Sequence, residues 1–187
     1  MPQPNPKIAV LLVGGHSTRM GSDKFAMDIN GRPQWEFMLG ELKSFFDEVH
    51  IACRRDQAHH FAEQRLIFDE LADIGPMGAI HAAFRQLGST SPLFFIACDL
   101  PNFNSGLSAK LHSELSAEYD VVAAYNAERE SPEPLVAFWS PSALPLIEKF
   151  IARENYALFK CMSQLKVKSV EIKDSTSLRN VNSLQDL

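Results

Sequence analysis

Short, continuous apolar segments recur along the chain and limit the folds that it can adopt. The first, Ile8 to Val13, has no charged residue and ends directly at Gly14-Gly15. An unbroken apolar run of this length is typical of a parallel β-strand that is buried on both faces. Similar segments follow at 48–52, 65–68, 93–97 and 120–124. Because longer stretches separate them, we predict an α/β fold with a mostly parallel, Rossmann-like sheet.

The stretches between these segments have the periodicity of helices. The clearest covers 34–46, which follows a predicted turn at Asn30-Gly31 and carries apolar residues at helical spacing. We predict further helices near 78–87, 108–115 and 141–152, and additional strands, including an antiparallel addition, at 134–139 and 166–172. No repeat or linker interrupts the pattern, so we expect residues 1–187 to form a single domain with three α/β/α layers.

The overall charge bears on which partners the chain can bind. Its 187 residues carry a formal net charge of -5, whereas nucleic-acid binding normally shows a basic excess or a clustered basic face. We therefore expect no nucleic-acid partner, and any phosphate binding must be local. The cysteines Cys53, Cys98 and Cys161 form no C-x-x-C pair, which fits the reducing cytoplasm. No segment approaches the roughly 18 apolar residues of a membrane-spanning helix, so we expect no membrane span.

A glycine-rich segment follows the first predicted strand. Residues 12–24 contain three glycines, three hydroxyl side chains and two cations, Arg19 and Lys24. Glycines let backbone N–H groups approach phosphate oxygens closely, and the cations add positive charge where a pyrophosphate leaves. The spacing matches neither a Walker loop nor the Gly-x-Gly-x-x-Gly fingerprint. The residues alone leave two interpretations open, a phosphate-binding loop and a solvated surface loop.

The order of residues in this segment resembles a known signature. Leu12-Val-Gly-Gly-His-Ser-Thr-Arg-Met-Gly-Ser-Asp-Lys24 is similar to the Leu-Ala-Gly-Gly-x-Ser-x-Arg-Met-Gly-x-Asp-Lys run of molybdenum cofactor guanylyltransferases, and Val13 is the departure. The resemblance implies a nucleotidyltransferase fold of the glycosyltransferase-A-like type. It also implies that Arg19 and Lys24 neutralise a bound triphosphate. The residues that it assigns to the guanine nucleotide are Leu12, Val13, Gly14 and Gly15.

A carboxylate ends the apolar segment 93–97. Asp99 follows Cys98 directly, and an aspartate at the end of a strand is often a turn or cap residue. The Cys98-Asp-Leu-Pro101 run also resembles the family's Cys-Asp-x-Pro motif, whose aspartate ligates Mg²⁺ on the nucleotide phosphates. Hard oxygen ligands with few protein contacts suit this ion. By this resemblance Asp99 is the metal ligand and the main catalytic residue.

An acidic loop between these two motifs also matches the family. The segment 68–79 resembles its Asp-…-Gly-Pro-Leu-x-Gly stretch, although Ala79 stands where many relatives have glycine. The resemblance implies that Asp69 contacts the nucleoside and that Gly75 and Gly78 permit close packing near the substrate. A solvent-facing acidic turn is the alternative for Asp69. Relatives often have asparagine where Ala52 stands, so no nucleoside contact is assigned to that position.

The segment 128–139 resembles the family's acceptor-side strand. Glu133 stands where glutamine or histidine is usual, and a carboxylate there would repel an anionic pterin phosphate. Arg129 could compensate this charge, and an exposed, solvated arginine is the alternative.

The run 179–186 resembles the family's Asn-Val-Asn segment. Alternation along an extended chain puts Asn180 and Asn182 on one side. We expect Asn182 to approach the metal or the attacking phosphate and Asn180 to help position the acceptor. The alternative is a helix-capping turn, in which asparagine and serine are favoured.

Together these resemblances imply a magnesium-dependent enzyme, which we expect in the cytoplasm because of its cysteines. It would transfer GMP from GTP to molybdopterin, release pyrophosphate, and make transient contacts with other molybdenum cofactor proteins. Two alternatives remain at this point. One is a related transferase, either the cytidylyl counterpart or a sugar-phosphate nucleotidyltransferase, and the other is an inactive nucleotide-binding adapter. Retention of Arg19, Lys24 and Asp99 together argues against the adapter.

Overall fold

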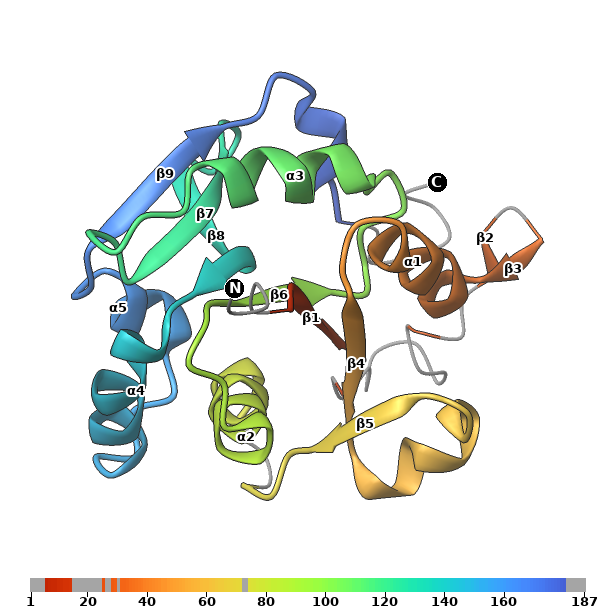
Figure 1. Cartoon of the computed structure of the whole chain (residues 1–187), viewed down its shortest axis with the longest axis horizontal. Coiled ribbons are helices and arrows are strands. Elements are labelled where there is room, and N and C mark those ends of the chain that lie inside the picture. Colours follow the sequence, from red (N-terminus) through yellow and green to blue (C-terminus); the bar gives the residue numbers. More distant parts are fainter. Residues whose placement is uncertain (1–5, 15–24, 26–27, 30, 72–73, 181–187) are drawn as a thin grey trace, which may run out of the picture.

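A mixed seven-stranded β-sheet forms the centre of the protein (Figure 1). The computed structural model describes residues 6–14, 25, 28–29, 31–71 and 74–180, without the side chains of Ile29 and Ser175. The strands lie in the order β5-β4-β1-β6-β8-β7-β9. Their bounds are β1 Ile8–Leu12, β4 Glu48–Cys53, β5 Arg65–Phe68, β6 Leu93–Ala97, β7 Val121–Asn126, β8 Ser131–Trp139 and β9 Val167–Glu171. All the main strands that the sequence predicts are therefore present.

The half of the sheet formed by β5, β4, β1 and β6 is parallel. β1 lies between β4 and β6, and Leu12 near its end pairs with Ala52 on one side and Ala97 on the other. Parallel neighbours require crossover connections, which the intervening helical segments provide. The carboxyl ends of these strands consequently meet at one edge, where open α/β sheets bind their ligands.

Within the described sheet, β8 alone runs in the opposite direction. It pairs antiparallel with both β6 and β7, whereas β9 pairs parallel with β7. The predicted antiparallel addition is thus β8. The register between β7 and β8 shifts between Ala123 and Tyr125, which marks a bulge. Because β8 is reversed, its beginning lies at the edge where β6 ends.

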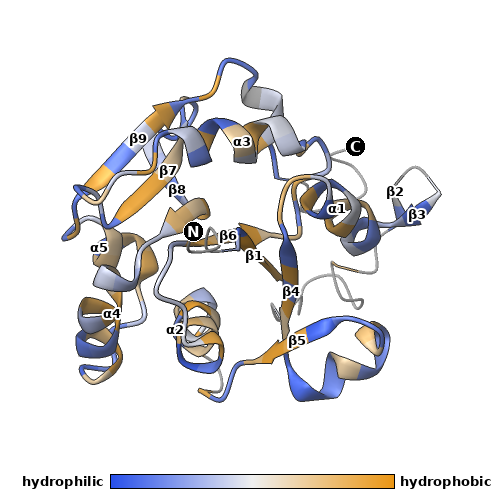
Figure 2. Cartoon of the chain, viewed as in Figure 1, coloured by the Kyte–Doolittle hydropathy of each residue, from blue (hydrophilic) through white to orange (hydrophobic). Residues whose placement is uncertain are grey.

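Helices cover both faces of the sheet and enclose two apolar clusters (Figure 1). α1 (Gln34–Lys43) and α3 (Ser105–Ser113) pack on one face, and α2 (Pro76–Leu87), α4 (Leu144–Ile151) and α5 (Leu158–Met162) pack on the other. The strands are mostly apolar and the surface of the helices carries many polar residues (Figure 2). The predicted three-layer architecture is confirmed. No helix in the described part of the chain has the length and apolar character needed to cross a membrane.

The four predicted helices are present with shifted bounds. α1 ends at Lys43, α2 and α3 begin earlier than predicted, and the segment 141–152 divides into a 3₁₀ turn, η3 (Pro141–Ala143), followed by α4. The earlier start of α3 has a tertiary cause. The N–H of Ser105 donates a hydrogen bond of 3.1 Å to Oε2 of Glu41 on α1, which stabilises an additional turn.

Several short elements were not predicted from the sequence. They are the 3₁₀ helices η2 (Arg55–Phe61) and η4 (Ser175–Leu178), helix α5, and the hairpin of β2 (Asp28–Ile29) and β3 (Arg32–Pro33). Gly31, from the predicted Asn30-Gly31 turn, stands directly before β3 and has the positive φ of 83° that such turns favour, while Asn30 lies outside the described residues. η2 is hydrophilic in sequence, but its Phe61 packs edge-on against Trp35 and Phe25 at centroid distances of 5.0 Å. Long-range aromatic contacts therefore hold η2 in place.

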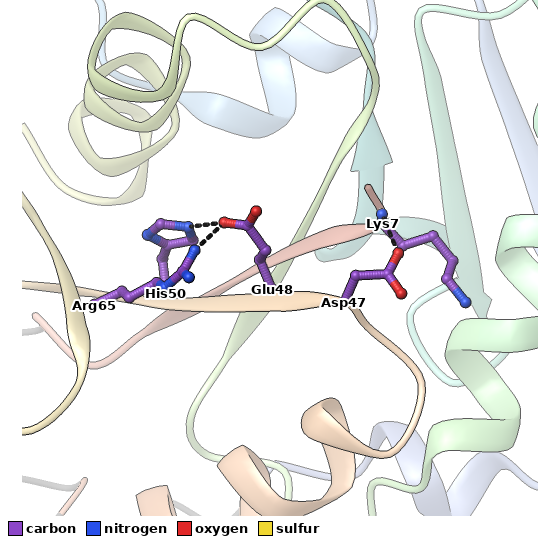
Figure 3. Close-up of polar contacts among 5 residues, drawn as sticks. All are labelled: Lys7, Asp47, Glu48, His50 and Arg65. Atoms are coloured by element: carbon purple, nitrogen blue, oxygen red, sulfur yellow. Dashed lines mark hydrogen bonds and ion pairs between the residues drawn. The ribbon is translucent and has the colours of Figure 1, made fainter. Parts of the chain in front are cut away.

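Charged side chains link the strands at the opposite edge of the sheet, where β4 begins (Figure 3). Arg65 of β5 donates to Oε2 of Glu48, and Nε2 of His50 lies 3.4 Å from the same oxygen. The backbone N–H of Lys7 donates to Oδ2 of Asp47 at 2.7 Å. Burial lowers the pKa of His50 below its usual 6.5, and Glu48 opposes this effect. These contacts stabilise the edge that faces away from the candidate site.

Candidate active site

Backbone hydrogen bonds hold together the carboxyl ends of β1, β4 and β6. The N–H of Val13 donates to the carbonyl of Ala52 at 3.0 Å, and the N–H of Cys98 donates to the carbonyl of Leu12 at 3.2 Å. Val13 is buried. These bonds extend the two ladders by one residue past β1 and β6. The residues that follow, Gly14 and Asp99, therefore emerge side by side from neighbouring strands.

Gly14 is exposed at the start of the glycine-rich segment. A Cβ atom there would lie 3.6 Å from Cα of Cys53 and 3.7 Å from the backbone of Ala52 and Arg54, which is ordinary contact. Packing alone therefore does not require glycine at position 14. Because Gly14 has no side chain, it leaves the neighbouring strand ends accessible. The predicted site residues Gly15, Arg19 and Lys24 lie outside the described residues.

Asp99 is half-buried at the end of β6. Its neighbours Cys98 and Leu100 are 6% and 2% exposed and belong to the apolar cluster under α1 and α3. A backbone bond from Phe103 to Leu100 closes the turn that follows. The backbone on both sides of Asp99 is therefore anchored, which restricts where its carboxylate can lie.

Asp69 follows β5 and packs against the first turn of α2. Its Oδ1 accepts a hydrogen bond of 3.0 Å from the N–H of Leu71. A Cβ atom at position 78 would lie 2.4 Å from Oδ2 of Asp69, so the carboxylate occupies the space that Gly78 leaves open. Burial raises the pKa of Asp69 above its usual 3.8, and the Leu71 N–H and the charge of His81 partly offset this effect. The predicted close packing at Gly78 is confirmed, and the group packed there is Asp69 itself.

Gly75 shapes the connection between Asp69 and α2. It has φ 66° and ψ -153°, a combination that is essentially restricted to glycine. It is the N-cap residue of α2, and Pro76 occupies the first helical position, where its missing N–H has no helical partner. This backbone geometry directs α2 toward Asp69.

Glu133 is compensated by its neighbours. Its Oε1 accepts hydrogen bonds from Nδ2 of Asn126 at 2.6 Å and from a guanidinium nitrogen of Arg129 at 3.2 Å. Both sequence interpretations of Arg129 apply in part, because it forms an ion pair with Glu133 in the hairpin between β7 and β8 while its side chain is 55% exposed. The sequence analysis did not single out Asn126.

The C-terminal segment contacts the turn that follows Asp99. Nδ2 of Asn102 lies 3.5 Å from the carbonyl of Thr176 in η4, and Leu178 is buried in the cluster under α1 and α3. Asn180 is half-buried and lies just beyond this anchor. The described helix η4 ends before it, so Asn180 does not cap η4. The predicted residue Asn182 lies outside the described residues.

Two arginines that the sequence analysis left without a role follow β4. Arg54 forms two hydrogen bonds of 3.1 Å to the carboxylate of Asp56, and Arg55 lies over the ring of Phe68 at 4.8 Å. β4 lies between the strand that leads to Gly14 and the strand that leads to Asp69. The sequence did contain a pattern that could have placed these two arginines at the edge of the sheet, because they are consecutive cations directly after a predicted strand.

The candidate site thus runs along one edge of the sheet. Asp69 follows β5, Arg54 follows β4, Gly14 follows β1 and Asp99 follows β6, and these strands are consecutive neighbours. Among the described residues, no three His, Cys, Asp or Glu side chains gather into a cage for a metal ion. At this edge, Asp69 and Asp99 are carboxylates that follow the ends of β5 and β6.

A mostly parallel sheet that presents a glycine-rich segment and a strand-end carboxylate at one edge is the architecture of a nucleotidyltransferase domain. The chain belongs to the family of MobA-like NTP transferase domains, which matches residues 9–168. This result confirms the resemblance found in the sequence.

Individual relatives agree with this assignment. The probable molybdenum cofactor guanylyltransferase of Peptoclostridium acidaminophilum is 32% identical over 161 residues, which cover 84% of this chain and 72% of that protein. The molybdenum cofactor guanylyltransferase of Vibrio cholerae is 28% identical over 188 residues, covering 99% and 91%.

Solved structures show the same fold. Molybdopterin-guanine dinucleotide biosynthesis protein A of Archaeoglobus fulgidus superimposes with a TM-score of 0.82 at 24% identity, covering 96% of this chain and 94% of that one. The 4-diphosphocytidyl-2C-methyl-D-erythritol synthase of Anaerococcus prevotii gives a TM-score of 0.67 at 14% identity, covering 96% and 93%.

Proposed function

We propose that this chain transfers GMP from GTP to molybdopterin, releasing pyrophosphate and forming molybdopterin guanine dinucleotide. The observation that carries the proposal is the backbone bond between Cys98 and Leu12, which brings Asp99 next to the start of the glycine-rich segment. A nucleotidyltransferase needs both features at one place, because the metal must act on the phosphates that the loop binds. The relatives named above as guanylyltransferases support GTP as the nucleotide.

The chemistry of the site fits Mg²⁺ held by Asp99. This ion prefers oxygen ligands, keeps several waters, and binds through one or two carboxylates together with substrate phosphates. The described edge offers such a carboxylate without a surrounding cage of ligands. When bound, Mg²⁺ would neutralise charge on the transferring phosphoryl group.

We assign the nucleotide to the half of the edge formed by β5, β4 and β1. The backbone of Leu12, Val13 and Gly14, followed by Gly15, would hold the guanine nucleotide, and Asp69 would contact the nucleoside. Arg19 and Lys24 would neutralise the pyrophosphate as it leaves. The fixed position of Asp69 against Gly78 supports its role, because a contact that selects a ligand must be preorganised.

The reaction needs no nucleophile from the protein. A phosphate oxygen of molybdopterin attacks the α-phosphorus of GTP, a new P–O bond forms, and the bond to the bridging oxygen of the pyrophosphate breaks. Positioning and electrostatic stabilisation supply most of the catalysis in such a displacement. Asn180 and Asn182 would position the acceptor, which the anchoring of η4 beside Asn102 supports.

We also propose that the enzyme acts in the cytoplasm and passes its product on through transient contacts with other molybdenum cofactor proteins. Its three cysteines, Cys53, Cys98 and Cys161, are buried free thiols, which is compatible with a reducing compartment. We expect neither nucleic acid nor a membrane among its partners.

The test is a transfer assay with purified protein, Mg²⁺, molybdopterin and each nucleoside triphosphate in turn, with the dinucleotide product identified by mass spectrometry. We expect GTP to be used far better than CTP or ATP. Equal or better turnover with CTP would assign the chain to the cytidylyl branch. Nucleotide binding without any product would instead indicate an adapter.

A further inference from the structure

Glu133 lies near the beginning of β8, which neighbours β6 in the sheet and begins at the edge where β6 ends and Asp99 follows. The last pair between β6 and β8 is Ile96 with Val136. Asp99 follows Ile96 by three residues and Glu133 precedes Val136 by three residues. Because β8 is antiparallel to β6, both residues extend past the ladder in the same direction. Glu133 therefore continues the candidate site beyond Asp99, on the side away from the nucleotide half.

The hairpin between β7 and β8 holds Glu133 in one position. Asn126 is 7% exposed, and its Oδ1 accepts hydrogen bonds from the N–H groups of Glu128 and Arg129 at 3.0 and 3.2 Å. The Nδ2 of the same side chain donates to Oε1 of Glu133 at 2.6 Å. Asn126 thus ties the turn and the glutamate together. Glu133 itself lies within the register shift between β7 and β8, which falls between the pairs Ala123–Ala137 and Tyr125–Pro132, and bulges often direct side chains next to active sites.

The two oxygens of Glu133 have different surroundings. Both hydrogen bonds to this carboxylate, from Asn126 and from Arg129, end on Oε1. Oε2 accepts none from the described residues. The side chain of Glu133 is 15% exposed, while that of Arg129 is 55% exposed. The site therefore combines a fixed, largely buried carboxylate with an acceptor oxygen that remains for a ligand.

The charges of Glu133 and Arg129 restrict the class of ligand that can bind to Oε2. A carboxylate accepts hydrogen bonds and cannot donate them, so Oε2 does not suit a phosphate group. The Arg129 guanidinium balances the charge of Glu133, which disfavours a metal cation at the same place. The remaining ligand class is a neutral group with N–H or O–H donors, for which a carboxylate is a strong acceptor.

We propose that Glu133 is a specificity-determining residue whose carboxylate accepts a hydrogen bond from the amino-pyrimidinone edge of the acceptor's pterin ring. The inference rests on the proposed function, which supplies a pterin as the acceptor. That edge carries an exocyclic amino group beside a ring N–H, and both are donors. A site built to bond such a donor rejects analogues that lack it, because its own polar group is then left unpaired.

The first test is Glu133→Gln, which keeps the shape of the side chain. Asn126 and Arg129 would engage its one oxygen, so an NH2 group that cannot accept would replace Oε2. Relatives usually have glutamine or histidine here, and the test asks whether these two partners make the carboxylate necessary in this chain. Loss of a hydrogen bond to a charged group should raise the KM for molybdopterin roughly 10- to 100-fold. The KM for GTP and the melting temperature should stay at their parent values. Glu128→Gln, on the same exposed turn, is the matched control and should leave all three quantities unchanged. An unchanged KM for molybdopterin in Glu133→Gln overturns the inference, as does a parallel change in KM for GTP and in stability.

The second test does not depend on transfer activity. Pterin and lumazine share one ring system and differ in an amino or oxo group at one carbon, and their own fluorescence reports binding. The parent protein should bind pterin at least tenfold more tightly than lumazine, and Glu133→Gln should lose this preference. Equal affinity of the parent for the two rings contradicts the inference. A preference that depends on Glu133 in a protein that transfers no GMP would instead contradict the proposed function and leave the pterin contact standing.

Discussion

The contact between Gly78 and Asp69 makes Gly78→Ala a direct test of the candidate site. A Cβ atom at position 78 would lie 2.4 Å from Oδ2 and 2.6 Å from Oδ1 of Asp69. Carbon and oxygen atoms in contact are usually about 3.3 Å apart, so the carboxylate must move by roughly 1 Å. Aspartate has a short side chain and its Oδ1 is bonded to Leu71, so the movement also strains that hydrogen bond.

The expected change in stability follows from two opposing effects. Alanine is favoured over glycine within a helix by about 1 kcal/mol, and overpacking a filled site costs about 1–3 kcal/mol. We therefore expect Gly78→Ala to lower the free energy of unfolding by about 0–2 kcal/mol in the parent protein. In an Asp69→Ala background the clash is absent, and the same substitution should raise stability by about 1 kcal/mol. The coupling energy between the two positions should be about 1–3 kcal/mol.

Urea denaturation of the parent, the two single variants and the double variant measures this coupling. Gly40→Ala is the matched control, because Gly40 lies in α1 and a Cβ atom there meets nothing within 4 Å. It should raise stability by about 1 kcal/mol in both backgrounds. Transfer assays on Gly78→Ala should show a loss of about tenfold or more, since a displacement of roughly 1 Å at a site can cost up to about a hundredfold. Equal stabilisation by Gly78→Ala with and without Asp69 would refute the packing argument, and parent activity would refute the role of Asp69.

Three further outcomes are expected. Asp99→Asn should keep the fold but lose about 10²–10³ in transfer rate, with partial recovery at high Mg²⁺, and a rate within about threefold of the parent would show that Asp99 is structural. Gln34→Met should raise the melting temperature by several degrees. The side chain of Gln34 is 2% exposed and its amide has no hydrogen-bond partner within the described residues, and an unpaired buried amide costs about 1–3 kcal/mol. A lower melting temperature would mean that the amide is paired. Burial lowers the pKa of His50 in the folded protein, so the folded state favours the neutral imidazole. The stability that depends on this neutral form is fully present above the unfolded pKa of 6.5, and it is lost as the pH falls through the lower pKa of the folded state. The free energy of unfolding, measured by urea denaturation from pH 7.5 to 5, should therefore fall less steeply in His50→Gln than in the parent, and identical slopes would contradict this account.

The sheet could be predicted because parallel strands that are buried on both faces leave unbroken apolar runs in the sequence. Residues 93–97, for example, are all apolar, and the structure buries them between β1 and β8. The bounds of helices were less predictable, since α3 begins where Glu41 of another helix accepts its first N–H. η2 could not be predicted, because the aromatic contacts of Phe61 with Trp35 and Phe25 join residues far apart in the chain.

The positions of site residues at the ends of strands could be predicted from the sequence, whereas contacts that depend on turns could not. The position of Asp99 next to Leu12 follows from the rule that neighbouring parallel strands end at a common edge. The packing of Asp69 against Gly78 was predicted only as close packing near the substrate, because sequence spacing does not show which group fills the space. Asn126 was missed because its role depends on the geometry of a hairpin that aligns it with Glu133.

The reversed direction of β8 divides the edge into two parts that are built differently. On one part of the edge, β4, β5 and β6 lead into the helical segments η2, α2 and α3, so a change in the length of these loops must be accommodated by packed elements. On the other side, the loop at 127–130 closes a hairpin and involves only the two strands that it joins. Substitutions, insertions or an entire exchanged hairpin can therefore alter what binds beside Glu133 while the strands that carry Gly14, Asp69 and Asp99 stay in register. With the acceptor bound as proposed, a local change in this one turn would be enough to admit a different acceptor.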